Sequence, residues 1–285
     1  MAGYKAPTPT ATTIAAPAIM LVGGSGGGKT YSLTTLLEAG LELFVFVTEP
    51  NGLETLIDTA LKKNLDVNRI HYQVISPTRQ GFNNLQQLAG TIGRSTFEAL
   101  SKMPPSPGRQ DAQFHRLLSG MADFVDERTG ESFGSIDSFG PDRVVVIDSL
   151  SGLNIMAMDL VVGDKVTAAP GEWGVAMNLL EKLLNKLTGD LKCYLVITAH
   201  LDREQDELTG GSKNMVGVLG RKLAPKVPRF FSEVVLAHRQ ADKFYWSTTE
   251  HNTDLKSRTL GLSDKLPPSF LPIVEAYKKR LEALK

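Results

Sequence analysis

The sequence predicts an α/β protein with a mostly parallel, doubly wound sheet and a C-terminal antiparallel hairpin. Short apolar runs alternate along the chain with amphipathic stretches of helical period, as in βα units. The apolar runs are nearly uninterrupted, which is typical of parallel strands covered on both faces. Two late runs, 233–238 and 243–248, are joined by the turn Gln240-Ala241-Asp242, which predicts the hairpin.

The elements follow in order along 285 residues, enough for one large α/β domain or two small ones. Apolar and β-branched runs predict strands at 18–22, 43–48, 70–75, 143–148, 193–199, 233–238 and 243–248. Helical periodicity predicts helices at 32–39, 53–63, 82–100 and 171–188. Residues 201–228 form a long polar, glycine-containing stretch, whose length indicates function or disorder.

Three parts of the chain are distinguished by composition. Residues 1–17 are rich in Ala, Thr and Pro without the pattern of a signal peptide, so we expect a disordered tail. Residues 18–262 form the expected core domain. Within it, 103–141 has weak periodicity and a proline cluster, and we expect a peripheral insertion there. Residues 263–285 are expected to close the chain with a helix.

Composition excludes several classes of protein. Lys+Arg and Asp+Glu both number 31, so net charge gives no support to a nucleic-acid partner and any such surface must be local. The single cysteine, Cys193, excludes a disulfide framework and a cysteine metal cluster. The apolar stretch 144–162 is interrupted by Asp148 and Asp159, so it predicts no membrane span. We therefore expect a cytoplasmic protein with no membrane contact.

A phosphate-binding loop joins the first predicted strand to the first predicted helix. The residues Gly23-Gly24-Ser25-Gly26-Gly27-Gly28-Lys29-Thr30 fit the pattern G-x-x-x-x-G-K-[ST]. The glycines let backbone N–H groups surround a phosphate, and the following helix adds positive potential at its N-terminus. We expect Lys29 to reach the β- and γ-phosphates of ATP, Thr30 to contact Mg²⁺, and Tyr31 to complete the nucleotide site. The alternative, a flexible Gly/Ser linker, does not explain the flanking strand and helix.

Two carboxylates at strand ends are candidates for the chemistry. Asp148 ends an apolar strand, which favours Mg²⁺ binding, although it also fits a cap of the next turn. Many P-loop ATPases place a Glu directly after this Asp, but here Ser149 stands there. Glu49 follows the strand at 43–48 and, if that strand lies beside the phosphate-loop strand, it would orient the attacking water. The alternative is a surface glutamate in a turn.

Polar groups later in the chain are candidates for sensing ATP and binding a polymer. His200 ends a predicted strand and is either a γ-phosphate sensor or a structural histidine. The stretch 212–232 holds five cations without Asp or Glu, so it is either a phosphodiester-binding loop or a solvated loop balanced by upstream acids. Those cations are Lys213, Arg221, Lys222, Lys226 and Arg229.

Lys256 and Arg258 are two residues apart and point the same way in an extended chain. Such a pair stabilises γ-phosphate charge on a neighbouring subunit in the manner of arginine fingers, or it is simply a pair of surface cations.

On these residues the chain resembles the RecA-type branch of P-loop ATPases, and within it the phage-encoded single-strand-annealing kind. The resemblance covers 18–262 and is poorest at 103–141. It implies that Glu49 activates water, that Asp148 holds Mg²⁺ and that His200 is the sensor. It also implies that 201–229 is a mobile DNA-binding loop and that Lys256-Ser257-Arg258 acts across a subunit interface.

The resemblance implies an ATP-hydrolysing oligomer that binds single-stranded DNA in phage recombination, annealing or replication. Its implied partners are phage replication or recombination proteins, in the host cytoplasm. An alternative is a nucleotide-dependent assembly or packaging motor acting on a protein, with 103–141 as the docking element. A small-molecule kinase is disfavoured because no lid with paired arginines is visible.

Overall fold

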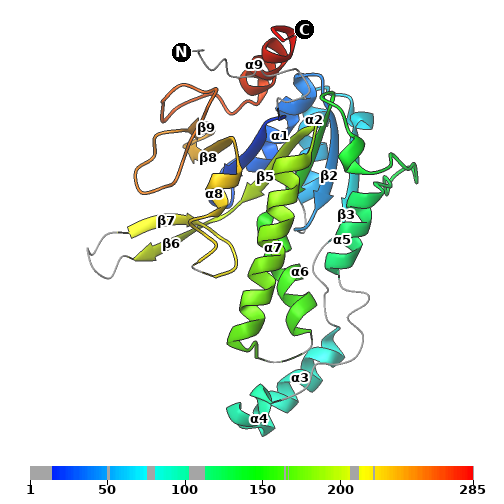
Figure 1. The fold of residues 1–285 in the computed structure, drawn as a ribbon, viewed down its shortest axis with the longest axis vertical. Coiled ribbons are helices and arrows are strands. Elements are labelled where there is room, and N and C mark those ends of the chain that lie inside the picture. The colour runs from blue at the N-terminus through cyan, green and yellow to red at the C-terminus, as the bar shows by residue number, and fades with distance from the viewer. Residues whose placement is uncertain are drawn as a thin grey trace, which may run out of the picture.

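The computed structural model describes residues 15–49, 52–75, 81–102, 113–163, 165, 167–205, 212–220 and 222–284. A seven-stranded sheet of order β3-β2-β4-β5-β1-β8-β9 forms its centre (Figure 1). Every neighbouring pair is parallel except β8 and β9, which form an antiparallel hairpin. The mostly parallel sheet and the C-terminal hairpin predicted from the sequence are therefore confirmed. The strands are β1 Ala18–Val22, β2 Glu42–Val47, β3 Ile70–Val74, β4 Arg143–Asp148, β5 Tyr194–Ala199, β8 Glu233–Gln240 and β9 Lys243–Ser247.

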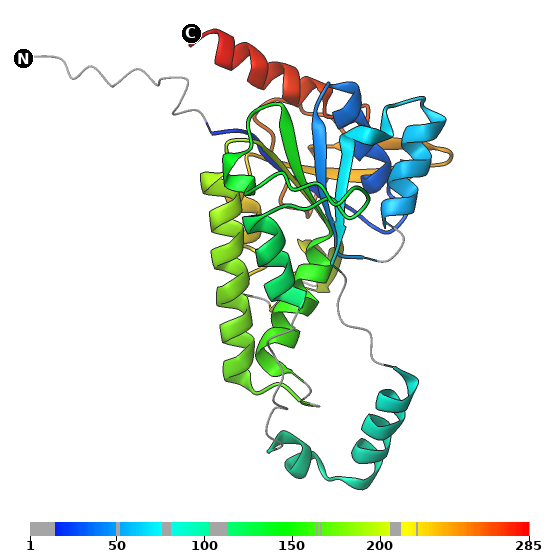
Figure 2. The same ribbon diagram turned by 90° about the vertical axis from the view of Figure 1, so that its right-hand side faces the viewer.

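Helices cover both faces of the sheet because alternate strand residues point to opposite sides. Ile19 and Leu21 of β1 belong to a core with α1, α2 and α9, whereas Met20 and Val22 belong to a core with α5, α6 and α7. Figures 1 and 2 show these two layers. The helices are α1 Lys29–Glu38, α2 Gly52–Lys62, α3 Phe82–Arg94, α4 Phe97–Ser101, α5 Gln113–Ala122, α6 Leu150–Val162, α7 Pro170–Asp190, α8 Val227–Phe230 and α9 Leu271–Glu282, with single 3₁₀ turns at Val67–Arg69 and Ile136–Ser138.

The strand order corrects one expectation about the site. We expected β2 to lie beside β1 if Glu49 was to face the phosphate loop, but β4 and β5 lie between them. Glu49 can still lie at the same edge as the phosphate loop, because the strands are parallel and the carboxyl ends of β1, β2, β4 and β5 meet there. Thr48 N–H donates to Asp148 O at 2.8 Å and Gly23 N–H donates to Ala199 O at 3.1 Å, so the pairing continues to that edge.

Part of the segment 103–141, which the sequence predicts as a peripheral insertion, packs into the core. Phe114 of α5, together with Phe124 and Phe139, is fully buried in the cluster beneath α6 and α7. The buried Asp126 ties the turn after α5 to β3 by accepting from Tyr72 N–H at 3.3 Å. Proline and glycine breakers weaken the sequence periodicity, but the aromatic residues between them fill the core. Residues 103–112 lie outside the described part.

The region 201–229 contains more regular structure than its sequence predicts. The strands β6 Leu201–Gln205 and β7 Ser212–Val216 pair antiparallel into a ribbon that extends from the carboxyl edge of the sheet (Figure 1). Most of its side chains are at least partly exposed, so no apolar alternation marks it as strand. Residues 206–211 and Arg221 lie outside the described part.

The chain ends on α9, whose Ile273, Val274 and Tyr277 pack into the core beside α1. This helix lies within the range expected for the C-terminal helix. The tail expected at 1–17 falls mostly on residues 1–14, which are outside the described part. Among the helices that are described, none combines the length and the apolar character that crossing a membrane requires.

Candidate nucleotide-binding site

The loop Gly23–Thr30 is pressed against the β8–β9 hairpin. A Cβ on Gly23 would lie 2.2 Å from Ala237 O, and one on Gly27 would lie 2.8 Å from the same atom. Gly28 has φ +89°, which favours glycine, and a Cβ there would meet the Phe244 ring at 2.6 Å. Only glycine therefore lets this backbone turn tightly at the start of α1, where the first N–H groups have no partners within the helix. This cradle fits a phosphate group.

Lys29 is buried in the loop. Its side-chain nitrogen Nζ donates to Gly23 O at 2.8 Å and to Gly24 O at 2.9 Å. Burial lowers the pKa of Lys29, and the charges of Asp148 and Glu49 partly oppose this effect. The ammonium group thus lies over the loop with two nearby carboxylates as its charge partners, which is the position from which a lysine contacts bound phosphates.

Asp148 is held between two hydroxyl groups at the end of β4. Thr30 Oγ1 donates to Asp148 Oδ2 at 2.9 Å, and Thr198 Oγ1 of β5 donates to Asp148 Oδ1. Burial raises the pKa of Asp148 although both hydroxyl groups favour its charged form. Octahedral Mg²⁺ with bonds of about 2.1 Å separates adjacent ligand oxygens by roughly 3 Å, so Thr30 and Asp148 fit this hard cation.

Glu49 reaches the same edge from β2. Ser149 Oγ donates to Glu49 Oε1, and His200 Nε2 lies 3.5 Å from that same oxygen. The side chains of Glu49 and His200 are 34% and 33% exposed, so both are open to solvent and to a ligand. Thus the structure brings Glu49, Lys29, Thr30, Asp148 and His200 together, although Glu49 and the loop belong to strands that are not neighbours.

Tyr31 flanks the loop on the side of the hairpin. Its ring packs on Phe244 with centroids 5.0 Å apart, and Lys63 Nζ lies 4.6 Å from the Tyr31 ring centroid. Phe244 also closes the space beside Gly28. In these contacts Tyr31 supports the packing of the loop, and its predicted contact with the nucleotide remains a prediction.

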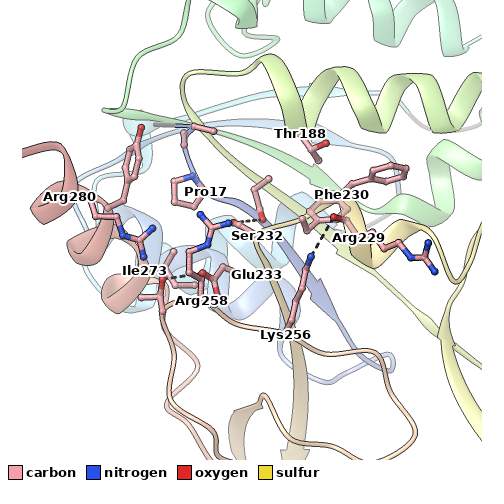
Figure 3. A pocket seen from close by; sticks show the side chains of 16 residues that line it. Pro17, Thr188, Arg229, Phe230, Ser232, Glu233, Lys256, Arg258, Ile273 and Arg280 are labelled. Atoms are coloured by element: carbon pink, nitrogen blue, oxygen red, sulfur yellow. Dashed lines mark hydrogen bonds between the residues drawn. The ribbon is translucent and has the colours of Figure 1, made fainter. Parts of the chain in front are cut away.

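Lys256 and Arg258 lie at the opposite edge of the sheet. They line a cavity of about 250 Å³ at the start of β1 and β8, together with Arg229 and Arg280 (Figure 3). Burial lowers the pKa of Lys256, and the neighbouring charge of Arg258 adds to this effect. Because the phosphate loop follows the far end of β1, neither cation reaches the loop of its own chain.

Glu233, a carboxylate that lines the same cavity, already accepts three hydrogen bonds. It accepts from Ser257 Oγ, from Arg258 N–H at 3.0 Å and from Thr259 Oγ1 at 3.0 Å. These bonds fix the backbone that carries the two cations. No described carboxylate forms an ion pair with Lys256 or Arg258, so their charges are available to a further anion.

The cations of the 212–232 stretch are partly neutralised in the folded chain. Lys213 pairs with Asp254 at 2.9 Å and Lys226 pairs with Glu181 at 3.1 Å. Both acids come from outside the stretch, so its local charge excess is smaller in space than along the sequence. Lys222 and Arg229 are exposed.

Sequence reasoning missed two hydroxyl side chains that organise the site. Thr198 is a buried polar residue within an otherwise apolar strand, two positions before His200. Thr48 is buried directly before Glu49, and its Oγ1 accepts from Ser149 N–H and donates to Ser149 O, both at 2.7 Å. A hydroxyl near the end of an apolar strand was the available signal in both cases. Among the described residues, no three His, Cys, Asp or Glu side chains gather as a separate metal site.

Comparison with protein-family models and with curated proteins gives no match. Among solved structures, a chain described as a prototypical ATPase from the type III secretion system of pathogenic bacteria has 11% identity and a TM-score of 0.38. The match covers 78% of this chain and 52% of that chain, so this chain spans about half of its length. The RadB recombinase has 13% identity and a TM-score of 0.31, over 86% of this chain and 94% of that chain. Values this low assign neither a family nor a function.

Proposed function

We propose that this chain is an ATPase of the RecA type that binds ATP with Mg²⁺ at Gly23–Thr30 and hydrolyses it. The observation that carries the proposal is the meeting of a glycine cradle, a buried lysine and two carboxylates at one sheet edge. Phosphoryl transfer needs mainly positioning and charge stabilisation, and these groups provide both. Mg²⁺, when bound, would neutralise charge on the β- and γ-phosphates.

Each residue then has a defined task. The loop N–H groups and Lys29 would hold the phosphates, while Thr30 and Asp148 would hold the metal ion. Glu49 orients a water molecule and accepts its proton as the water oxygen bonds to the γ-phosphorus and the bond to ADP breaks. His200 lies 3.5 Å from Glu49, which supports a sensor that responds when the γ-phosphate is lost.

Assembly is part of this proposal. Lys256 and Arg258 lie at the opposite edge from their own phosphate loop, and no described carboxylate forms an ion pair with either cation. A head-to-tail contact between copies would bring this edge to the nucleotide of a neighbour, where the two cations would stabilise the transferring phosphoryl group. We therefore propose that turnover depends on self-association.

Single-stranded DNA is the proposed polymer partner, within phage recombination, annealing or replication. The ribbon β6–β7 begins directly after His200, which supports a link between the nucleotide and a DNA-binding segment. The ion pairs of Lys213 and Lys226 favour the alternative, an assembly or packaging motor acting on a protein. So do the exposed Phe82 and Phe97 on α3 and α4, which lie away from the sheet in Figures 1 and 2.

The test is phosphate release from ATP with Mg²⁺, with and without a labelled single strand whose anisotropy is followed as salt is raised. We expect free phosphate, and DNA binding that weakens steeply with salt because phosphate contacts release counterions. Lys29→Ala should weaken nucleotide binding by at least about tenfold, whereas the exposed Lys265→Ala should not. Phosphate release without any DNA effect would favour the protein-directed motor, and a phosphorylated acceptor in place of free phosphate would indicate a kinase.

A further inference from the structure

Ser149 stands where many P-loop ATPases carry a glutamate, and it contacts the glutamate of the neighbouring strand. The residue is fully buried at the junction of β4 and α6. Its Oγ accepts from Ser151 N–H at 3.2 Å and lies within hydrogen-bonding distance of Glu49 Oε1. Because a carboxylate oxygen accepts hydrogen bonds, the hydroxyl proton of Ser149 is shared with Glu49 Oε1. Ser149 is thus a donor to Glu49.

The backbone of Ser149 is fixed from the other side by Thr48. The Thr48 hydroxyl group accepts from Ser149 N–H and donates to Ser149 O, both at 2.7 Å. A Cβ on Gly152 would lie 2.4 Å from Thr48 Oγ1, so α6 is packed tightly against the end of β2. Val47 pairs with Asp148 in the β2–β4 register, which places Thr48 beside Ser149. The donor is therefore rigid, whereas the Glu49 side chain is 34% exposed.

We propose that Ser149 is a positioning residue that fixes the Glu49 carboxylate for its reaction with water. The proposal rests on the proposed role of Glu49 as the group that orients water. Both contacts of Glu49 with described side chains, Ser149 Oγ and His200 Nε2, are made by Oε1. Oε2 is left to accept the proton of the water. In this chain the serine after the strand Asp holds in place a glutamate that comes from the adjacent strand.

Removing the hydroxyl should affect the chemical step and spare binding. Without its donor, the Glu49 side chain can rotate away from the water, and small misplacements of a catalytic group cost large factors in rate. We expect kcat for ATP to fall about tenfold in Ser149→Ala, with the dissociation constant of a fluorescent ATP analogue unchanged within about twofold. The phosphate loop and its contacts with Lys29 are not altered by this change.

The experiment compares Ser149→Ala, Ser149→Gly and the control Ser151→Ala in phosphate release and analogue binding. Ser151→Ala keeps the backbone N–H that Ser149 accepts and should behave as the unmodified protein. Ser149→Gly removes the hydroxyl but keeps a residue favoured at a helix N-cap, so it replaces Ser149→Ala if that variant does not fold. Thermal melting of each variant confirms that the fold is retained.

A second background shows whether Ser149 acts through Glu49. Residual single-turnover hydrolysis in Glu49→Gln should be unchanged when Ser149→Ala is added, because the residue to be positioned is already disabled. Two results would overturn the inference and leave the proposed function intact. One is an equal loss of hydrolysis rate when Ser149→Ala is added to the unmodified protein and to Glu49→Gln. The other is normal kcat in both Ser149 variants while Glu49→Gln is inactive. Normal turnover in Glu49→Gln would instead remove the catalytic assignment on which the inference rests.

Discussion

Thr198 shows at the scale of a single residue how the fold holds the carboxylate proposed to bind Mg²⁺. Its hydroxyl donates to Asp148 Oδ1 from the neighbouring strand, while Thr30 donates to Oδ2. Burial raises the pKa of Asp148, whereas the two donors and the charge of Lys29 favour its charged form. Threonine also fits a parallel strand, because its branched side chain packs as valine does.

We predict that Thr198→Val weakens the use of Mg²⁺ while the fold is retained. The substitution keeps the shape but removes a donor to a buried carboxylate, which costs about 1–3 kcal/mol where the partner is charged. The Mg²⁺ concentration for half-maximal phosphate release should rise roughly tenfold, in line with a loss of about 1.4 kcal/mol. Thr35→Ser, on the far side of α1, is the control. An unchanged Mg²⁺ dependence would show that Thr198 has no part in the metal site.

The turn after α5 illustrates how an element outside the regular pattern is fixed to the sheet. The fully buried Asp126 accepts from the N–H groups of Arg128 and Tyr72, from Thr129 Oγ1 at 3.2 Å, and contacts His71 Nδ1 at 3.3 Å. Burial alone would raise the pKa of Asp126, but these donors together lower it below its ordinary value. The carboxylate therefore stabilises the folded chain in its charged form.

Stability should depend on Asp126 at neutral pH and lose that dependence in acid. Because the folded-state pKa is lowered, the contribution is present above the unfolded value of about 3.9 and is lost as pH falls through the folded value. At pH 7 we expect Asp126→Asn to lower the free energy of unfolding by about 2 kcal/mol, and the difference to shrink below pH 4. Urea unfolding from pH 7 to pH 3 measures this. Asp123→Asn, on an exposed side chain of the same turn, should change little, and an Asp126 effect independent of pH would contradict the account.

Across the whole molecule, prediction from sequence was most accurate for elements that are determined by short local patterns of residues. The apolar runs predicted the inner strands of the sheet because parallel strands covered on both faces are mostly apolar, whereas the edge strands β3 and β9 were predicted from their β-branched and aromatic residues. The glycine loop and Asp148 could be selected as candidate site residues because glycine spacing and a strand-end carboxylate are local features. The helix α6 was missed because its apolar residues have no single face: Leu153 and Met156 are buried, whereas Ile155 is exposed.

Other features depended on contacts that no single segment reveals. Strand order cannot be read from the βα pattern, so the separation of β2 from β1 by two strands was not anticipated. The ion pairs of Lys213 and Lys226 join acids far away along the chain. The hydroxyl groups of Ser149 and Thr198 donate to carboxylates that come from neighbouring strands. These hydrogen bonds therefore could not be predicted from any single segment.

The position of Lys256 and Arg258 leads to a prediction about assembly. If they act on a neighbour, Arg258→Ala chains lack the trans-acting group, and Lys29→Ala chains lack the nucleotide but still provide Arg258. Each variant alone should release phosphate at no more than about 1% of the normal rate, since arginine fingers contribute about 10³-fold or more. Mixing the two should restore a measurable fraction, and mixing Lys29→Ala with the control Lys265→Ala should not exceed the activity of the control alone. If the mixture releases phosphate at the sum of the rates of the two separate variants, the site is not shared between subunits.

In the proposed function, Glu49 and the phosphate loop form one hydrolytic site. It is tested most directly by phosphate release and ATP binding in Glu49→Gln, with Glu54→Gln on the exposed side of α2 as the matched control. We expect Glu49→Gln to bind ATP normally and to lose at least about 10²-fold in turnover, because it lacks the group that activates water. The control should keep both properties. Normal turnover by Glu49→Gln, with ATP binding retained, would show that Glu49 does not activate the water.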